Sequence, residues 1–346
     1  MNTLFRAARF CGFVPQGMPM DAMMRAARLH EIGGPQNLRI DEIPRAEPAA
    51  GETLVRVRAA AFNHRDVFIT QGLYPGIALP RTLGSDGAGV HEETGDDVVI
   101  DPMLGWGDDP HVWKPDASIL GMPHEGTFAQ FVAVPKVNIF PKPPHLSMEE
   151  AAAIPLAGLT AYRATFTRGE LRAGETILIP GIGGGVQTFV LLFAKAAGAR
   201  AIVTSGSDEK LERARALGAD LAINYQSNPD WHKAIKRGEV DLVVDSSGGD
   251  TLNKALGVVR PGGRAVIYGG TRPEATVRLF TIFWNHLDIR GTSMGSPQDF
   301  RAMVDLVTKH QLRPVVDRVF AMNDAAAAAE RMAHGEQFGK IVLKID

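Results

Sequence analysis

The stretch TILIPGIGGGVQTFVLLFAKAAG, residues 176–198, decides the fold. A short apolar strand, TILIP, runs into a glycine turn, and the turn opens a helix that ends at Gly198. Such glycines let the backbone approach a pyrophosphate, and the start of the helix supplies N–H donors with a partial positive charge. The third glycine of a dinucleotide fingerprint is missing, because Val186 or Gln187 stands there. The turn is therefore either a dinucleotide site or a glycine-rich turn without a ligand.

The segments that follow this turn favour the dinucleotide site. Short apolar strands alternate with helical segments, and the helix SDEKLERARALG starts at a serine cap and ends at Gly218. Further strands are expected at AIVT, VDLVVD (240–245), RAVIYGG (264–270) and LDIRGTSM (287–294). This alternation predicts an α/β domain with a doubly wound parallel sheet.

The end of the second strand, VTSGSDEK, distinguishes NAD from NADP. An NAD site carries an acidic residue there, which binds the ribose 2′-OH. Here Ser205 and Gly206 occupy the strand end, and neither repels a phosphate. Ser205, Ser207 and Lys210 are expected to form a small cradle for a 2′-phosphate, which favours NADPH over NADH. The alternative is an ordinary helix cap for Ser207 and a solvated surface position for Lys210.

The two ends of the chain show a different sequence pattern from its middle. Residues from about 25 to 145 show β-like alternation broken by Gly/Pro clusters, and the tail RPVVDRVF…FGKIVLKI returns to strand character. A length of 346 residues is large for one core, so two domains are expected. Residues 101–126 lack periodicity and predict a long functional surface loop.

Composition limits the partners of the chain. A formal net charge of −2 gives no reason to expect nucleic acid or an anionic membrane. No apolar run approaches the ~18 residues that a membrane span needs. The single cysteine, Cys11, excludes an intrachain disulfide and multi-cysteine metal sites, and it fits a reducing, cytoplasmic compartment. Residues 1–23 are interpreted as a poorly packed extension, with a transit-like segment as the alternative.

Together these motifs resemble the medium-chain dehydrogenase/reductase superfamily. The matching stretches include FNHRDVFITQGLYPGIALPRTLGSDGAGV, IPLAGLTAYRA, GGGVQTFVLLFAKAAGA, VDLVVDSSGGDTLNKAL and RPGGRAVIYGG. Within the superfamily the chain looks like the zinc-free branch of quinone oxidoreductases and enoyl reductases. The resemblance implies a β-rich, GroES-like catalytic domain over residues 24–158 and 296–346, and a Rossmann dinucleotide-binding domain over residues 159–295.

The positions that match zinc ligands in the zinc alcohol dehydrogenases carry other residues here. Asn63 and Ala157 stand where those enzymes have cysteines, and Ser85 stands where they have a histidine. Zinc sites need three or four converging N, S or O ligands, so no zinc is expected. Asp101, His111 and His124 are the remaining metal candidates, but their spacing matches no ligand pattern, and surface histidines are the preferred interpretation.

The resemblance also implies where the cofactor lies. His64 is expected beside the pyrophosphate, while Asp66 bonds nearby backbone in a structural role. Tyr74 and Thr160 match residues at the nicotinamide pocket, and Tyr225 matches one near the adenosine phosphate. The remaining expected contacts come from the glycine loop, from later strand ends and from a lysine reaching the phosphates across the cleft: Gly183, Gly184, Gly185, Val186, Ser246, Ser247, Gly269, Gly270 and Lys340. Packing or surface exposure is the alternative for each.

Without a Lewis acid, conjugate reduction is favoured over alcohol oxidation, because nothing then lowers the pKa of the alcohol so that it can form an alkoxide. Asn63 and Tyr74 are the expected catalytic donors, with Tyr74 or solvent supplying the proton, so neutral donors alone would polarise the substrate. The predicted activity is NADPH-dependent, zinc-independent reduction of a small-molecule quinone or α,β-unsaturated carbonyl. Metal-free oxidation of alcohols and non-catalytic NADPH binding remain alternatives. A homodimer joined near LDIRGTSM is expected from the family.

Overall fold

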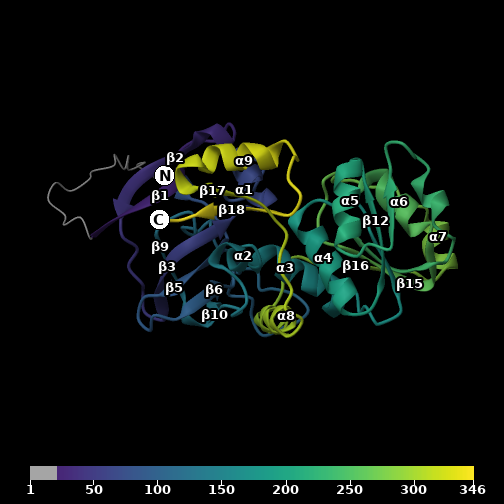
Figure 1. Ribbon diagram of the computed structural model, residues 1–346, viewed down its shortest axis with the longest axis horizontal. Helices are drawn as coiled ribbons and strands as arrows, with labels where there is room; N and C mark the ends of the chain where they lie inside the picture. Colours follow the sequence, from purple (N-terminus) through teal and green to yellow (C-terminus); the bar gives the residue numbers. More distant parts are fainter. Residues whose placement is uncertain (1–21) are drawn as a thin grey trace, which may run out of the picture.

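The computed structural model describes residues 22–346, so the expectations for Cys11 and for most of the N-terminal extension lie outside the described residues. Strand β1 already begins at Met23. Figure 1 shows two regions side by side, with the two ends of the described chain together in one of them. Within residues 22–346 no helix is long and apolar enough to cross a membrane.

The middle of the chain forms the expected parallel sheet. Its strands lie in the order β13-β12-β11-β14-β15-β16, and every neighbouring pair is parallel. They are β11 (Thr176–Ile179), β12 (Arg200–Ser205), β13 (Leu221–Asn224), β14 (Val240–Asp245), β15 (Val259–Ile267) and β16 (Asp288–Gly291). The chain winds outward from β11 in both directions, so the strand order reverses between β11 and β14. A doubly wound sheet binds ligands in the crevice at this reversal.

The helices of this region connect the strands. They are α4 (Gly185–Ala196), α5 (Asp208–Ala216), the 3-10 turn η5 (Trp231–Ala234), α6 (Gly249–Leu256) and α7 (Leu279–Trp284). Helix α5 starts as the sequence predicts, since the Ser207 hydroxyl accepts a hydrogen bond from the Lys210 backbone N–H at 3.3 Å. Gly218 follows the helix with φ +98°, a conformation that glycine adopts without strain.

The other region is rich in antiparallel strands, as the fold prediction requires. A seven-stranded sheet has the order β10-β6-β5-β3-β18-β17, with β9 also paired to β3. These are β3 (Glu52–Ala61), β5 (Asp86–His91), β6 (Asp97–Ile100), β9 (Phe131–Pro135), β10 (Ile139–Pro141), β17 (Val316–Ala321) and β18 (Lys340–Lys344). A three-stranded sheet contains β2 (Leu38–Pro44), β1 (Met23–Leu29) and β4 (Arg81–Thr82). The C-terminal strands therefore return to the N-terminal region.

Helices fill the space around and between the sheets. They are η2 (Pro35–Asn37), α1 (His64–Thr70), η3 (Lys136–Asn138), α2 (Met148–Ala152), α3 (Pro155–Tyr162) with its π-helical extension η4 (Arg163–Thr167), α8 (Pro297–Lys309), η6 (Met322–Asp324) and α9 (Ala325–Ala333). Helix α3 packs on α4 and α8 between the two regions (Figure 1). The domain boundary expected at residue 158 therefore falls inside a helix.

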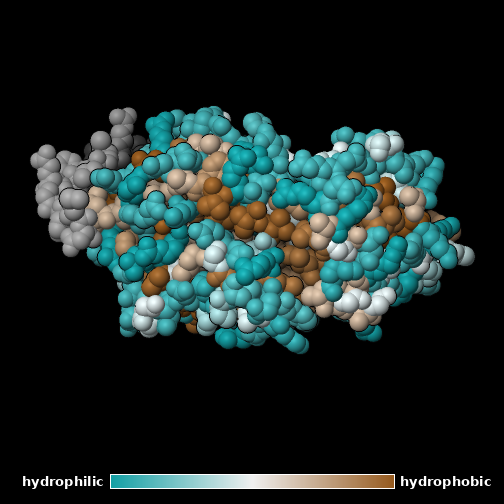
Figure 2. Space-filling model, viewed as in Figure 1, coloured by the Kyte–Doolittle hydropathy of each residue, from teal (hydrophilic) through white to brown (hydrophobic). Residues whose placement is uncertain are grey.

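One hydrophobic cluster links the two sheets. It runs from Val99 in the antiparallel sheet through Ile154 to Ile177 in β11, and all three side chains are fully buried. Figure 2 shows a band of apolar residues crossing the middle of the molecule in the same view. Burial of apolar area in a shared core stabilises the orientation of the two regions and of the cleft between them.

The expected loop at residues 101–126 is more ordered than its sequence suggests. It contains the two-stranded ribbon β7 (Met103–Leu104) and β8 (Ser118–Ile119). The buried Arg163 guanidinium donates hydrogen bonds from Nη2 to the carbonyls of Pro110 and His111, at 2.8 and 2.9 Å. A side chain distant in sequence thus provides order that local periodicity does not reveal.

Candidate functional site

A cavity of about 870 Å³ opens between the two regions, at the carboxyl ends of the parallel strands. Its walls include the turn after β11, the ends of β12, β14 and β15, and parts of α1 and α3. The sequence-predicted residues that line it are Asn63, His64, Tyr74, Thr160, Gly183, Gly184, Gly185, Val186, Ser205, Lys210, Tyr225, Ser246, Ser247, Gly269, Gly270 and Lys340. A cleft at the reversal point of strand order is the position where such a fold binds its ligand.

The glycine turn has the backbone shape that a close ligand requires. Gly181 and Gly183 have φ values of +71° and +149°, which residues with a Cβ rarely adopt. The Gly339 N–H donates to the Gly183 carbonyl at 2.8 Å, so the start of β18 fixes the loop from across the cleft. Helix α4 begins directly afterwards at Gly185, and its first N–H groups have no intrahelical acceptors. The turn therefore fits an anionic pyrophosphate.

Positive charge gathers beside this turn. The Lys210 amine donates to the Gly335 carbonyl at 2.7 Å, and a Cβ built on Gly183 would lie 3.1 Å from the Lys210 side chain. His64 is accessible from the open cleft yet lies deep within it. Burial, followed by the charges of Lys340 and Lys210, lowers the pKa of His64. These effects describe a positive potential that suits phosphate groups.

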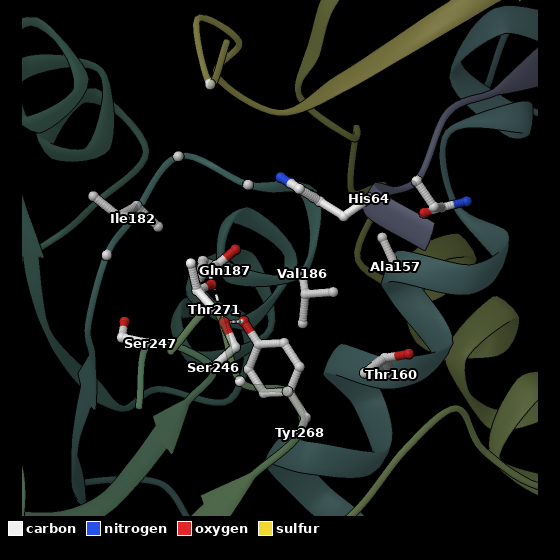
Figure 3. Close-up of a pocket in the computed structure, with 18 of the residues that line it drawn as sticks. His64, Ala157, Thr160, Ile182, Val186, Gln187, Ser246, Ser247, Tyr268 and Thr271 are labelled. Atoms are coloured by element: carbon white, nitrogen blue, oxygen red, sulfur yellow. Dashed lines mark hydrogen bonds between the residues drawn. The ribbon is translucent and has the colours of Figure 1, made fainter. Parts of the chain in front are cut away.

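The polar groups at the ends of β14 and β15 form a connected chain. The Gln187 side-chain amide donates to the Ser246 hydroxyl at 3.1 Å, and Ser246 donates to the Tyr268 hydroxyl at 3.0 Å (Figure 3). Burial raises the pKa of Tyr268, so its phenol stays neutral. In Figure 3 the Tyr268 ring, Val186 and Thr160 border the same space. All three residues line the cavity.

The expected cradle for a 2′-phosphate differs from its prediction at one residue. Ser205, Lys210 and Tyr225 line the cavity, but Ser207 is not among the lining residues. The Ser207 hydroxyl instead caps α5, as the alternative interpretation holds, because it accepts from the Lys210 backbone. Tyr225 is 41% exposed, and a Cβ built on Gly206 would lie 3.0 Å from its hydroxyl. The missing side chain at Gly206 leaves this phenol accessible.

The Lys340 side chain lies beside the glycine loop, since a Cβ built on Gly185 would lie 2.6 Å from it. Its amine contacts the Asn63 side-chain carbonyl at 2.6 Å and the Asp86 carboxylate at 2.8 Å, so the amine already has two partners within the described chain. Asn63 in turn donates from Nδ2 to Asp86 at 3.0 Å, and the Leu156 N–H donates to the second Asp86 oxygen at 2.7 Å. A fully buried carboxylate needs a cation, and Lys340 supplies it.

The register of three strands explains this network. Val342 of β18 lies opposite Ala61 of β3, and Asp86 of β5 lies opposite Ala61 on the other side. Two residues further along, Lys340 therefore reaches Asn63, which follows β3. Asp66 has the structural role that was expected, since its carboxylate accepts the Asn63 backbone N–H at 2.8 Å. Burial raises the pKa of Asp66 to about 6.

The other position that matches a zinc ligand also contacts a cationic side chain. The Ser85 hydroxyl accepts a hydrogen bond from Nη1 of Arg65 at 2.5 Å, and Arg65 lines the cavity. Within residues 22–346, no three His, Cys, Asp or Glu side chains converge so as to hold a metal ion. Asp101 is buried and accepts the Met103 N–H, whereas His111 and His124 are exposed.

The lining residues that the sequence interpretation missed include Arg65, Gln187 and Tyr268. In the sequence, Gln187 stands out only as a departure from the glycine pattern. Tyr268 directly precedes the expected Gly269, so its place at a strand end was a usable signal. Arg65 has no such signal, because the fold alone brings its partners together.

Comparison with known proteins places these features in a family context. Residues 49–144 match the alcohol dehydrogenase GroES-like domain, and residues 185–309 match the zinc-binding dehydrogenase domain. The chain is 36% identical to the zinc-type alcohol dehydrogenase-like protein YogA of Leptosphaeria maculans, covering 89% of this chain and 94% of that protein. It is 30% identical to a quinone oxidoreductase of Pseudomonas aeruginosa, covering 93% and 99%. A solved structure described as an NAD-dependent alcohol dehydrogenase superposes with a TM-score of 0.86 at 36% identity, covering 93% and 100%.

Proposed function

Because the chain belongs to the medium-chain dehydrogenase/reductase superfamily and is an oxidoreductase that uses a nicotinamide cofactor, we propose that it reduces quinones or α,β-unsaturated carbonyls with NADPH and without zinc. One observation carries the proposal. The positions that match zinc ligands hold an amide, a hydroxyl and a methyl group, and the two polar groups are bonded to Lys340 and Arg65.

The residues around these positions do not fit zinc. Zinc takes thiolate, imidazole or carboxylate ligands, and Asn63, Ser85 and Ala157 offer none of them. Asp86 is a carboxylate, but it already pairs with Lys340. The charges of Lys340 and Arg65 would also repel a divalent ion, because Coulomb energies between close charges in a partly buried site are about several kcal/mol. Purified protein is therefore expected to contain less than stoichiometric zinc and to keep its activity after treatment with a chelator.

The chain's own groups bind and orient the reactants. NADPH, when bound, supplies a hydride. The glycine turn and the start of α4 fit its pyrophosphate, while Thr160, Val186 and Tyr268 border the space that suits its nicotinamide. Trp113 and Ile119 of the 101–126 segment also line the cavity, where their apolar side chains would help to exclude water from a bound substrate. The Tyr74 hydroxyl accepts from Arg65 Nε at 3.3 Å, which leaves its own proton available for the product.

A substrate panel tests this proposal. NADPH consumption is measured with quinones, enones and simple alcohol or aldehyde pairs. We expect turnover with quinones or enones, and Tyr74→Phe is expected to lower kcat by about 100-fold while changing the Kd for NADPH little. Asn63→Ala is expected to act in the same direction, although it also removes a partner of Lys340. Tyr162→Phe is the matched control, because Tyr162 packs on Phe166 and Phe193 instead.

The same panel separates the alternatives. Oxidation of alcohols without turnover of any enone or quinone would favour a metal-free alcohol dehydrogenase. Tight NADPH binding without turnover of any substrate would favour a non-catalytic binding protein. Wild-type rates in both Asn63→Ala and Tyr74→Phe would contradict the assignment of these two residues.

The preference for NADPH over NADH has its own support. Lys210 and Tyr225 line the cavity next to the end of β12, and no acidic side chain occupies Ser205 or Gly206. Lys210→Met is expected to weaken NADPH binding about 10- to 100-fold, because a hydrogen bond to a charged group contributes about 1.5–3 kcal/mol. Binding of NADH is expected to weaken less, because NADH shares the pyrophosphate but lacks the 2′-phosphate; titration of cofactor fluorescence measures both affinities. Equal losses for both cofactors would favour the NAD dependence that the similar solved structure carries in its name.

We also propose that the protein is a homodimer in a reducing, cytoplasmic compartment. Strand β16 is the outer strand of the parallel sheet, and helix α7 beside it exposes Leu279, Phe280, Phe283 and Trp284. A free strand edge flanked by exposed aromatic side chains is suited to pairing with a second copy. Light scattering is expected to give twice the chain mass, and Ile289→Lys with Trp284→Glu is expected to give the monomer mass. A wild-type monomer at micromolar concentration would exclude this dimer.

A further inference from the structure

Arg65 is a buried cation without an acidic partner. Arg65 is 8% exposed and lines the cavity. Within residues 22–346 its guanidinium forms no salt bridge and bonds neutral groups instead. The other two buried arginines of the described chain are paired differently. Arg163 contacts Asp299 at 2.6 Å, and Arg264 contacts Glu175 at 2.5 Å. An arginine taken out of water without a counter-ion costs several kcal/mol, so its charge at this place needs an explanation.

Neutral groups hold the Arg65 guanidinium in one orientation. Nη1 donates to the Ser85 hydroxyl at 2.5 Å and to the Leu120 carbonyl at 2.8 Å. Nη2 donates to the Met122 carbonyl at 3.2 Å, and Nε donates to Tyr74 at 3.3 Å. A guanidinium has five N–H groups, so these four bonds leave one N–H of Nη2 without a partner in the described chain. The side chain is therefore rigid, fully charged and able to donate once more.

This charge lies beside the residues to which the proposed function assigns catalytic roles. The guanidinium carbon lies 4.8 Å from the centre of the Tyr74 ring, and Arg65 follows Asn63 by two residues at the start of α1. Its partner Ser85 stands where the zinc alcohol dehydrogenases, by the resemblance of the sequence, carry a histidine ligand. The expectation that neutral donors alone polarise the substrate is thus incomplete, because a guanidinium lies beside those donors.

We propose that Arg65 is a catalytic residue, and that it stabilises the negative charge that forms on the substrate's carbonyl oxygen. This inference rests on the proposed reduction of enones or quinones. In the step, the β-carbon of an enone gains a hydride and forms a C–H bond, and the nicotinamide becomes oxidised. The π electron pair moves toward the carbonyl, whose oxygen becomes an enolate anion next to Arg65. A proton from Tyr74 or solvent then completes the product, while Arg65 keeps its own protons throughout.

The expected loss of activity is large. Removal of one preorganised donor to a developing oxyanion lowers kcat by about 100- to 1000-fold in other enzymes. Arg65→Gln is therefore expected to lower kcat for enones by that factor while the Kd for NADPH stays within about threefold. Arg65→Lys keeps the charge but loses the forked donors, and it is expected to retain an intermediate rate.

A spectroscopic probe separates a direct charge effect from a structural one. 4-Nitrophenol resembles an enolate when ionised, and its two forms absorb at different wavelengths. In the presence of NADP⁺, wild-type protein is expected to lower the pKa of bound 4-nitrophenol by about 1 to 3 pH units, as a cation within 4–6 Å does. Arg65→Gln is expected to remove the part of this decrease that the positively charged nicotinamide ring of NADP⁺ does not supply, and Arg65→Lys to keep some of it.

Arg163→Gln is the matched control. Arg163 is also buried, lies 4.8 Å from the Trp106 ring and donates to two carbonyls of the same 101–126 segment, but it does not line the cavity. It is expected to lower thermal stability without changing the pKa of bound nitrophenol. An equal change in Arg163→Gln, an unchanged pKa in Arg65→Gln, or no binding of nitrophenol to wild type would overturn the inference. The proposed function alone would be refuted if Arg65 lowered the pKa of bound nitrophenol but the protein reduced no substrate.

Discussion

Replacement of Lys340 by methionine is expected to lower the free energy of unfolding by about 3–5 kcal/mol, because it leaves a buried carboxylate without its cation. Asp86 is fully buried and Lys340 is 2% exposed, with 2.8 Å between the amine and the carboxylate. The remaining partners of Asp86 are the Asn63 amide and the Leu156 N–H, which are neutral. Urea unfolding followed by tryptophan fluorescence measures the loss.

Two further variants isolate the charge effect. Lys340→Met combined with Asp86→Asn removes both charges and is expected to recover much of the lost stability. Lys195→Met removes a lysine that contacts Asp220 at the same 2.8 Å, but this pair is about one-third exposed and is expected to matter far less. A loss in Lys340→Met no larger than that in Lys195→Met would show that the buried pair does not stabilise the fold.

The sequence predicted those features that depend on local pattern. The strand, glycine turn and helix at residues 176–198 appear as β11, the positive-φ glycines and α4. Alternating strands and helices implied the doubly wound sheet, and that sheet places Ser246 and Gly269 at one cleft without knowledge of any side-chain contact. Each of these predictions needs only residue periodicity, turn chemistry and a general rule about parallel sheets.

The features that were missed or misplaced depend on pairing between distant segments. Lys340 lies 277 residues from Asn63 in the chain, and only the register of β18 on β3 brings them together. The Arg65 guanidinium is held by hydrogen bonds to the carbonyls of Leu120 and Met122, which lie in a segment without sequence periodicity. Ser207 differs from both, because its capping of α5 follows from local sequence alone, as the alternative interpretation holds.

Substitution of Gly183 by valine is expected to raise the Kd for NADPH at least 100-fold, equivalent to about 2.7 kcal/mol. Gly183 has φ +149°, where a β-branched residue is strained by about 1–3 kcal/mol. Its new side chain would also start 3.1 Å from Lys210 and project beside the turn that suits the pyrophosphate. Fluorescence titration with NADPH measures the change.

Gly218→Val separates lost cofactor binding from general strain. Gly218 also has a positive φ, +98°, and a Cβ built there would lie 3.3 Å from another lysine, Lys195. It ends α5 and does not line the cavity. Both variants are expected to lose stability, because both strain the backbone, but only Gly183→Val fills space beside the N–H donors that an anion needs. If Gly218→Val weakened NADPH binding as much, backbone strain alone would explain the result. If Gly183→Val bound NADPH normally, the pyrophosphate would have to lie away from the glycine turn.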